Sequence, residues 1–378
     1  MNNLISSKYS DLNFNKREQD IANEILGANP YNKEFISDKL QLISEAKSLS
    51  SALITLFRQQ VQSGFVLSDP VCDKQKKSKY LLDKETGINF CLQWNPNREL
   101  RLNHDLLIER GVINTDIDQE LLINRDDNEK PCYLCSQNID IQNSIEILFP
   151  INLSGIKYYC GANFVPITDN HFTIMSEEHK PQNYDSTLIL SMIDFVEKTN
   201  GVFKAIFNGK AGASILSHLH LQGTTEKLPV EDMNISDHDM IFSDSETRVY
   251  KPQYYLPLFI LESESVKSIN KKTDQIIQNW RSLNPHFHTQ NIIVLKQNGK
   301  FRVFVFLRDT RKLKGSSKEG DMGTFECSGL LVLSKGILDT TNHSTEERGL
   351  FENSNLDTIK NLLKEIAPEY KIDVRDLI

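Results

Sequence analysis

The sequence predicts an α+β protein in which helices cover antiparallel sheets, and three observations support that prediction. Apolar residues recur at three- and four-residue spacing between Ile36 and Phe57, which is typical of amphipathic helices. Short β-branched and apolar runs follow one another between residues 145 and 222. A second series of such runs occupies 255–333, and a helical pattern from Leu356 to Ile366 follows it.

The N-terminal part and the first sheet-forming part divide near residue 85. Residues 1–84 are expected to form an N-terminal helical segment, and residues 71–79 are interpreted as a basic loop. Residues 85–225 form a first domain in which Asp185 supplies the side-chain cap of a helix. The strands of this domain are expected at 87–94, 145–151, 155–160, 171–175, 203–207 and 217–222.

The second half of the chain follows a polar stretch. Residues 226–250 are polar and acidic, and they suit a linker or long loop. Residues 251–378 then form a second domain that ends in the C-terminal helix. Its strands are expected at 255–261, 291–296, 302–307 and 330–333. This order loosely echoes the first domain, although no residue-level repeat accompanies it.

The composition of the 378 residues limits the function before any motif is considered. With 39% hydrophobic and 25% charged residues, the chain can bury a sizeable core. The net charge of −8 argues against a nucleic-acid partner, while small anionic substrates need only a few local cations. No apolar run approaches the ~18 residues of a membrane span, and the first residues lack a signal-peptide pattern. We therefore expect a cytoplasmic protein without a membrane partner.

Polar and apolar residues alternate in Ser217-His-Leu-His-Leu-Gln222. On a strand, successive side chains point to opposite faces, so His218, His220 and Gln222 would share one face at ~7 Å steps. A single histidine on a strand is commonly structural, and the significance of the pair depends on the residues around it.

The loop before that stretch offers groups that suit a phosphate. Gly209 and Gly212 allow tight turns and close approach of a ligand to the backbone. Asn208, Ser214, Ser217 and the N–H groups of the loop can donate hydrogen bonds to phosphate oxygens. A donor-rich loop beside paired histidines indicates a site for nucleotidyl transfer.

The run from Asn208 to Gln222 resembles the signature of the histidine-triad superfamily. It is most similar to the transferase branch, in which His-x-His-x-Gln replaces His-x-His-x-His. That branch includes galactose-1-phosphate uridylyltransferases, diadenosine tetraphosphate phosphorylases and GDP-L-galactose phosphorylases. Elements at 93–98, 131–135 and 171–182 are similar to those of a bacterial group within the branch. The resemblance covers roughly residues 90–225.

The resemblance implies two histidine-triad-like units in one chain, which together mimic a dimer. It makes His220 the nucleophile that attacks an α-phosphorus, and Gln222 a donor to a phosphate oxygen. Glutamine in place of the third histidine removes an acid/base group that helps hydrolysis, which favours transfer to a second substrate. Arg98 would lie near phosphate, and Asn163 and Phe164 in the nucleoside pocket. Arg98 also suits a surface position, and Phe164 a core position.

Cys132-Tyr-Leu-Cys135 has the spacing of a metal-ligand pair. No βαβ pattern precedes it, which argues against a redox pair. The resemblance implies structural Zn²⁺ held by Cys132, Cys135, His179 and His218, with His171 as the competing third ligand. Other members of the superfamily lack zinc, so both outcomes remain open.

Two further segments, at 308–314 and 320–323, lie in the second half of the chain. The basic residues at 308–314 are interpreted as a solvated turn, although such residues reach the bound nucleotide in two-domain members of the superfamily. Residues 320–323 are interpreted as a backbone turn without an assigned role.

These features together predict a nucleotidyltransferase or nucleotide phosphorylase that works by ping-pong transfer through a nucleotidyl-histidine at His220. The donor would be a nucleotide-sugar or a dinucleoside polyphosphate, and the acceptor inorganic phosphate or a sugar 1-phosphate. A nucleotide hydrolase and a zinc-stabilised nucleotide-binding module without turnover are the alternatives. The sequence leaves open the base, the sugar, and whether the protein is a monomer or a homodimer.

Overall fold

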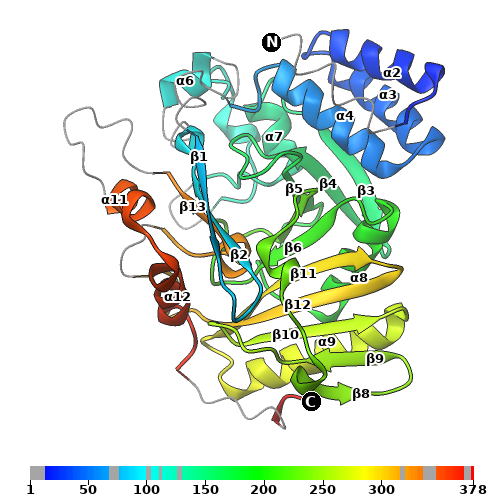
Figure 1. The fold of residues 1–378 in the computed structure, drawn as a ribbon. Helices are drawn as coiled ribbons and strands as arrows, with labels where there is room; N and C mark the ends of the chain where they lie inside the picture. The colour runs from blue at the N-terminus through cyan, green and yellow to red at the C-terminus, as the bar shows by residue number, and fades with distance from the viewer. Residues whose placement is uncertain are drawn as a thin grey trace.

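The computed structural model describes residues 13–67, 76–98, 104–109, 113–125, 130–315, 320–334, 346–369 and 376–378. Its central feature is a ten-stranded antiparallel sheet with the order β3-β4-β5-β7-β6-β11-β12-β10-β9-β8 (Figure 1). The strands from the first half are β3 (Leu148–Leu153), β4 (Ile156–Ala162), β5 (Phe172–Ser176), β6 (Lys204–Asn208) and β7 (His220–Thr224). Those from the second half are β8 (Met240–Ser243), β9 (Thr247–Tyr250), β10 (Leu258–Ser263), β11 (His288–Gln297) and β12 (Lys300–Asp309).

The two halves of the sheet meet where β6 pairs with β11. Asn208 lies opposite Asn291 in this antiparallel pairing. Each half also supplies one long helix, α8 (Ser186–Lys198) or α9 (Val266–Leu283), and both helices cover the same face of the sheet (Figure 1). The predicted α+β class with antiparallel sheets is confirmed.

Local sequence explains where α8 begins and which face it buries. The side chain of Asp185 accepts a hydrogen bond from the backbone N–H of Thr187 at 2.8 Å, which satisfies a donor left free at the helix start. Ile189, Met192 and Val196 are buried against the sheet, as their spacing predicts.

A smaller sheet packs over the other face of the large one. It has the order β1-β2-β13, formed by β1 (Lys77–Leu82), β2 (Asn89–Trp94) and β13 (Leu330–Leu333). β2 and β13 are parallel, so the first and second halves of the chain are also joined here. Apolar residues of both sheets form one cluster, which includes Phe90, Leu331, Ile206, Ile293 and Phe304.

Helices border the small sheet and complete the described part of the second half. They are α10 (Thr324–Cys327), α11 (Glu346–Asn353) and α12 (Leu356–Glu365). The last of these confirms the predicted C-terminal helix, whose Ile359 and Leu363 are fully buried. The helices α6 (His104–Glu109) and α7 (Ser136–Gln142) and the 3₁₀ turn η3 (Gln119–Leu121) lie between β2 and β3 in the chain.

The described part of the N-terminal segment before residue 68 is largely helical. It contains α2 (Lys16–Gly27), α3 (Lys33–Ala46) and α4 (Leu49–Gln62), which stack together at one end of the molecule (Figure 1). The single apolar pattern of the sequence is divided between α3 and α4. Ser48 separates them because its side chain accepts from the backbone N–H of Ser51 at 3.2 Å and starts a new helix.

Two segments differ from the expectation. Residues 77–82, assigned to the N-terminal helical segment and partly to a basic loop, pair in full register with β2, so the boundary between 84 and 85 falls inside a hairpin. The interpretation of 226–250 as a linker needs correction too. This segment contains the 3₁₀ turns η4 (Pro229–Asp232) and η5 (Asp237–Asp239) and the hairpin of β8 and β9. An edge hairpin needs few apolar residues, which explains the polar composition.

The strand expected at 217–222 begins later, at His220. The backbone N–H of Leu219 instead donates to the carbonyl of Lys180 at 2.6 Å, outside the strand. Only His220 and Gln222 of the three polar residues therefore lie on β7. In the ranges that the structure describes, no helix has the length and apolar character needed to span a membrane.

Candidate functional site

His220 is the first residue of β7 and faces away from α8 and α9. Its neighbour Leu221 belongs to the core on the helix side of the sheet, and alternate strand residues point to opposite faces. The Nδ1 atom of His220 lies 2.9 Å from the carbonyl oxygen of His218, an acceptor, so Nδ1 carries the proton. Nε2 then carries the lone pair of the ring, and no hydrogen bond among the described residues uses it. Burial lowers the pKa of His220, which favours this neutral ring.

Gln182 fixes the backbone on which His220 sits. Its Oε1 accepts from the backbone N–H of His220 at 2.8 Å. Its Nε2 donates to the carbonyl oxygens of Asn208, at 2.8 Å, and of His220, at 3.0 Å. The ladder between β6 and β7 ends at Ile206 and Gln222, so this side chain replaces the missing backbone bonds beyond that point. Gln182 is the last residue of the element at 171–182, but no role was predicted for it from the sequence.

The carboxamide of Gln222 lies on the same face as His220, two residues further along β7. Its Oε1 is 3.0 Å from Nε2 of His171, which directly precedes β5. His171 was the competing third zinc ligand in the sequence interpretation. The structure places it beside Gln222 instead.

The second half of the chain reaches the site through α10. Both the backbone N–H of Thr324, at 2.8 Å, and its hydroxyl, at 2.5 Å, donate to Oδ1 of Asn208. The ring of Phe325 meets His171 edge-on, with centroids 5.3 Å apart. No motif pointed to Thr324 or Phe325, because only the tertiary fold brings α10 to the end of β6.

Glycines allow this close approach between the halves. Gly212 has φ +107°, and a Cβ added there would lie 2.5 Å from Cα of Gly323. A Cβ on Gly209 would lie 2.3 Å from the carbonyl oxygen of Gln290. The turn at 320–323 therefore packs directly against the loop that precedes His220, and a Cβ at position 212 would collide with it.

Ser214 and Ser217 are exposed in the loop between β6 and β7. Both hydroxyls can therefore reach a ligand in solvent. The structure thus brings the predicted loop residues, Asn208 and the paired positions 220 and 222 to one end of the sheet.

The remaining predicted ligand-binding residues cluster around a turn at 163–166. Arg98 donates through Nη1 to the carbonyl oxygen of Val165 at 2.6 Å. Burial lowers the pKa of His171, and the charge of Arg98 adds a smaller effect in the same direction. Oδ1 of Asn163 accepts from the backbone N–H of Val165 at 3.1 Å. The ring of Phe164 packs towards Phe65, with centroids 6.4 Å apart. All three side chains thus have structural contacts in this turn.

The basic segment at 308–314 is not a solvated turn at its first residue, because Arg308 still belongs to β12. Arg308 is fully buried, and its guanidinium donates to the carbonyl oxygen of Met322 at 2.7 Å and to Sγ of Cys327 at 3.0 Å. These bonds hold the turn at 320–323 and α10 in place. Arg311 and Lys312 form ion pairs with Asp309 and Glu369.

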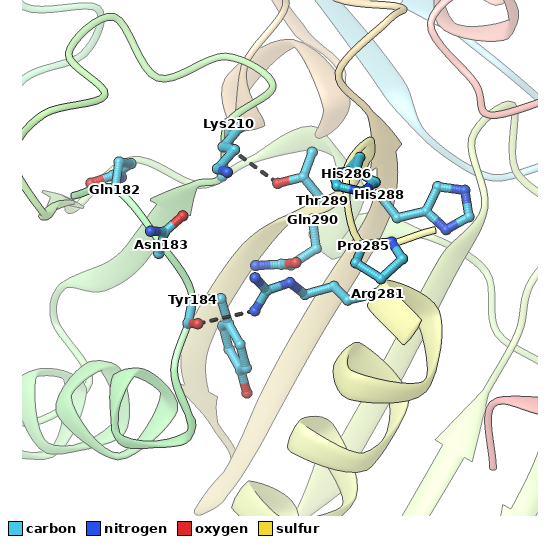
Figure 2. Close-up of a pocket in the computed structure, with 11 residues that line it drawn as sticks. Gln182, Asn183, Tyr184, Lys210, Arg281, Pro285, His286, His288, Thr289 and Gln290 are labelled. Atoms are coloured by element: carbon cyan, nitrogen blue, oxygen red, sulfur yellow. Dashed lines mark hydrogen bonds between the residues drawn. The ribbon is translucent and has the colours of Figure 1, made fainter. Parts of the chain in front are cut away.

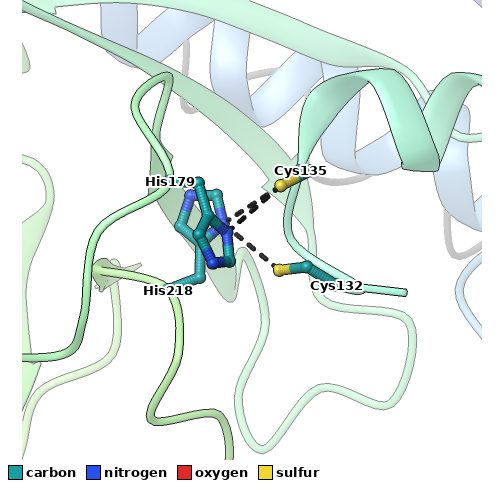
Figure 3. A group of neighbouring side chains, drawn as sticks. All are labelled: Cys132, Cys135, His179 and His218. Carbon is teal, nitrogen blue, oxygen red and sulfur yellow. Dashed lines mark hydrogen bonds between the residues drawn. The ribbon is translucent and has the colours of Figure 1, made fainter. Parts of the chain in front are cut away.

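The four predicted metal ligands come together (Figure 3). Their ligand atoms all lie within 4.8 Å of one another. Nδ1 of His218 is 3.3 Å from Sγ of Cys132 and 3.6 Å from Sγ of Cys135, and Nδ1 of His179 is 3.4 Å from Sγ of Cys135. Nε2 of His218 donates to the carbonyl oxygen of Ser176 at 2.8 Å, so the Nδ1 lone pair faces the sulfurs.

The chemistry of this cluster fits a metal ion. Two sulfurs and two imidazole nitrogens are the donors of a tetrahedral site. Burial raises the pKa of the Cys135 thiol to about 11, so a thiolate is favourable here only beside a cation. The Cys132–Cys135 loop and the residues that precede β7 would then be tied together by one ion.

A pocket opens on the other side of the same sheet end. It is lined in part by Gln182, Lys210, Arg281, His288 and Gln290 (Figure 2). Gln290 alternates with Asn291 along β11 and therefore points to the helix-covered face. Arg281 reaches from α9 to the carbonyl oxygen of Tyr184 at 3.0 Å. His220 is not one of the residues that line this pocket.

Residues 112–225 match the family described as Domain of unknown function (DUF4922). Galactose-1-phosphate uridylyltransferase of Clostridium perfringens (strain 13 / Type A) is 30% identical over 177 residues, which cover 42% of this chain and 34% of that relative. The enzyme of the same description from Caldanaerobacter subterraneus subsp. tengcongensis is 20% identical over 210 residues, which cover 48% and 40%. The matched part thus spans well under half the length of these relatives.

A solved structure shares the fold more widely. Yeast Ap4A phosphorylase in complex with Ap4A aligns with 83% of this chain and 95% of that chain, with a TM-score of 0.50 and 15% identity. This likeness concerns the fold alone. The predicted resemblance to the transferase branch of the histidine-triad superfamily is confirmed by the sequence similarities.

The DUF4922 match contains most of the candidate site. The metal-ligand cluster, His171, Gln182, His220 and Gln222 lie within residues 112–225. Arg98 and Thr324 lie outside it. The part of the site that α10 contributes therefore belongs to a region that this family match does not cover.

Proposed function

We propose that the chain catalyses nucleotidyl transfer or nucleotide phosphorolysis through a covalent nucleotidyl-histidine at His220. The observation that carries this proposal is the 2.9 Å contact between Nδ1 of His220 and the carbonyl oxygen of His218. It fixes the tautomer and the orientation of the ring, so that the Nε2 lone pair is presented as the nucleophile. A neutral imidazole held in this way is a competent nucleophile near neutral pH.

The proposed reaction consists of two displacements. Nε2 of His220 forms a bond to the α-phosphorus of the donor while the bond to the leaving phosphate oxygen breaks. The ring then carries a positive charge, which the carbonyl of His218 stabilises through Nδ1–H. The acceptor oxygen attacks the same phosphorus in the second step, and His220 returns to its neutral state.

Two carboxamides supply donors to the reacting phosphate. The oxygen of Gln222 is occupied by His171, and the oxygen of Asn208 by Thr324. Their NH₂ groups can therefore donate to phosphate oxygens as negative charge develops. Ser214 and Ser217 would add hydroxyl donors from the exposed loop. No acid/base histidine stands at position 222, which favours transfer over hydrolysis.

The donor class we propose is a nucleotide-sugar or a dinucleoside polyphosphate. The relatives' descriptions and the fold neighbour support these two classes. The acceptor would be a sugar 1-phosphate or inorganic phosphate. The positive charge of Arg98 is proposed to attract the phosphate groups of the substrate. Asn163 and Phe164 are proposed to border the nucleoside.

We also propose that residues 85–225 and 251–378 act as two histidine-triad-like units. The second would take the position that a partner subunit occupies in a dimer. The contacts of Thr324 and Phe325 with Asn208 and His171 support this arrangement, because they complete the site from the second unit.

Zinc is the metal that suits the Cys₂His₂ cluster best. Cys132, Cys135, His179 and His218 would hold it, and its contribution would be structural, as a cross-link beneath the catalytic strand. The test is elemental analysis of protein purified without added metal. About one equivalent of zinc is expected. Zinc content near zero in folded protein would refute this assignment.

Intact mass spectrometry tests the proposed chemistry. The protein is incubated with nucleoside diphosphate sugars and dinucleoside polyphosphates, without an acceptor. A nucleoside monophosphate adduct on the wild type and none on His220→Ala supports the covalent intermediate. Release of free monophosphate without an acceptor would favour the hydrolase. Measurable binding with neither adduct nor turnover would favour the non-catalytic module.

A further inference from the structure

Both ring nitrogens of His171 are engaged in the core of the site. The side chain is 1% exposed. Nδ1 lies 3.2 Å from the backbone nitrogen of Ile167, and Nε2 lies 3.0 Å from Oε1 of Gln222. The ring thus bridges the turn before β5 and the candidate catalytic strand.

The contact with Ile167 determines which nitrogen of His171 carries the proton. A backbone N–H can only donate, so Nδ1 must accept with its lone pair. Burial lowers the pKa of His171 to about 3, which keeps the ring neutral. A neutral ring that accepts at Nδ1 carries its proton on Nε2.

The protonated Nε2 in turn determines how the carboxamide of Gln222 is oriented. The atom that faces it must be an acceptor, which is Oε1. A flipped carboxamide would bring two donors face to face at a buried position. The Nε2 amide group of Gln222 therefore points away from His171. Within the described part of the chain, no hydrogen bond uses that amide group.

We propose that His171 is a positioning residue that holds the Gln222 carboxamide with its NH₂ group towards the reacting phosphate. The inference rests on the proposed function, because it assigns a partner for the amide of Gln222. His171 would not touch the substrate itself. It would act through Gln222 by removing the alternative orientation of the side chain.

The second half of the chain holds the His171 ring in place. Phe325 of α10 meets the ring edge-on, with an angle of 77° between the planes. Arg98 lies close enough to disfavour protonation of the ring. These contacts come from opposite parts of the chain, so the orientation of Gln222 depends on assembly of both units.

Two substitutions separate the two bonds of His171. In His171→Asn, the side-chain carbonyl replaces Nδ1 and keeps the bond to Ile167, but the side chain is too short to reach Gln222. In His171→Gln, the amide nitrogen replaces Nε2 and keeps a donor to Gln222. We expect kcat to fall about a hundredfold in His171→Asn, the scale for loss of one transition-state donor, with little change in KM. His171→Gln should recover most of that loss.

A double-mutant cycle tests whether His171 acts through Gln222. Gln222→Ala should lower kcat to a similar extent, and adding His171→Asn should lower it little further. Equal losses from His171→Asn in both backgrounds, or a loss in His171→Gln as large as that in His171→Asn, would overturn the positioning role.

A spectroscopic measurement keeps the inference distinct from the proposed function. Nitrogen NMR of the imidazole rings in the full chain should show a neutral His171 ring protonated at Nε2 across the neutral pH range. A ring protonated at Nδ1, or a charged ring, would overturn the orientation argument even if His220 is catalytic. Absence of any nucleotidyl adduct, with the Nε2 tautomer present, would count against the proposed function instead.

Discussion

Thr324 and Asn208 are joined by two hydrogen bonds across the seam between the halves of the chain. The backbone N–H of Thr324 donates to Oδ1 of Asn208 at 2.8 Å, and the threonine hydroxyl approaches the same oxygen at 2.5 Å. The hydroxyl also lies 3.0 Å from the carbonyl oxygen of Phe207, so its one hydrogen is shared. These contacts with α10 hold Oδ1 of Asn208 towards Thr324 and so determine the direction of its NH₂ group.

Removal of the Thr324 hydroxyl should weaken both stability and transfer. Thr324→Val keeps the side-chain shape and the backbone N–H. It removes the hydroxyl donor to Oδ1 of Asn208 and to the carbonyl oxygen of Phe207. We expect a loss of about 1–2 kcal/mol in the free energy of unfolding and about a tenfold lower kcat. Thr324→Ser keeps the hydroxyl and should lose far less activity. Denaturant unfolding and initial rates measure the two effects, and equal rates for both variants would contradict the expectation.

The pH dependence of transfer should reflect a depressed pKa at His220. The proposed nucleophile is the neutral ring of His220, and burial lowers the pKa of this ring from the ordinary 6.5. Since protonation removes the Nε2 lone pair, kcat/KM should hold level as the pH falls through 6.5 and decline only at more acidic values. A pH–rate profile of the first transfer step checks this. An acid limb with its midpoint above 6.5 would show that the ring is not buried in the neutral form described.

Gly212 offers a test of the close packing between the two halves. Its φ of +107° and the 2.5 Å distance from an added Cβ to Cα of Gly323 combine strain with a steric clash. Gly299 has φ +80° but nothing within 4 Å of an added Cβ. Gly299→Ala should therefore cost about 1 kcal/mol from backbone strain alone. Gly212→Ala should cost about 2–3 kcal/mol more, because the turn at 320–323 must move.

Urea unfolding compares the two glycine variants directly. Activity provides a second measure, since displacement of the 320–323 turn should disturb Thr324 and Asn208. The packing argument would be wrong if both substitutions destabilised the protein equally and left transfer unchanged.

Part of the candidate site follows from local sequence. Three local patterns pointed to it. They are the alternation around His220 and Gln222, the glycine loop that suits a phosphate, and the cysteine pair with metal-ligand spacing. The metal-ligand set came from a family resemblance, and the structure brings all four residues together. The class of fold was also predictable, because apolar residues recur with a period of two in the strands and of 3.6 in the helices.

The remainder depends on long-range pairing that local patterns do not contain. Thr324 meets Asn208 at a sequence separation of 116 residues, and no spacing links them. β1 was not predicted because a partly exposed edge strand needs few apolar residues. His171 was predicted only as a competing third metal ligand, because histidine serves both as ligand and as hydrogen-bond donor. Only its position beside Gln222 separates these roles.

Loss of one of the four proposed metal ligands should abolish metal binding and destabilise β7, the strand that carries the proposed nucleophile. Cys135 belongs to the Cys₂His₂ cluster, whereas Cys160 is buried in β4 outside it. Cys135→Ala and Cys160→Ala each remove one buried thiol. We expect zinc content to fall from about one equivalent towards zero only in Cys135→Ala. Because the carbonyl of His218 holds His220, transfer should fall in the same variant.

Metal analysis and thermal unfolding, with and without a chelator, measure this difference. Chelation should lower the unfolding temperature of wild type and of Cys160→Ala, and should leave Cys135→Ala unchanged. Identical zinc content in the two variants would argue against the assigned ligand set.

The identity of residue 222 should decide how the intermediate is divided between acceptor and water. In Gln222→His, an imidazole replaces the carboxamide and can take a proton from an attacking water. The ratio of hydrolysis to transfer should therefore rise by about tenfold or more. Gln222→Glu is the matched control. It keeps an oxygen for His171, but its carboxylate repels phosphate, so both reactions should slow without a change in their ratio. Product analysis with a saturating acceptor gives the ratio, and an unchanged ratio in Gln222→His would mean that another feature of the site excludes water.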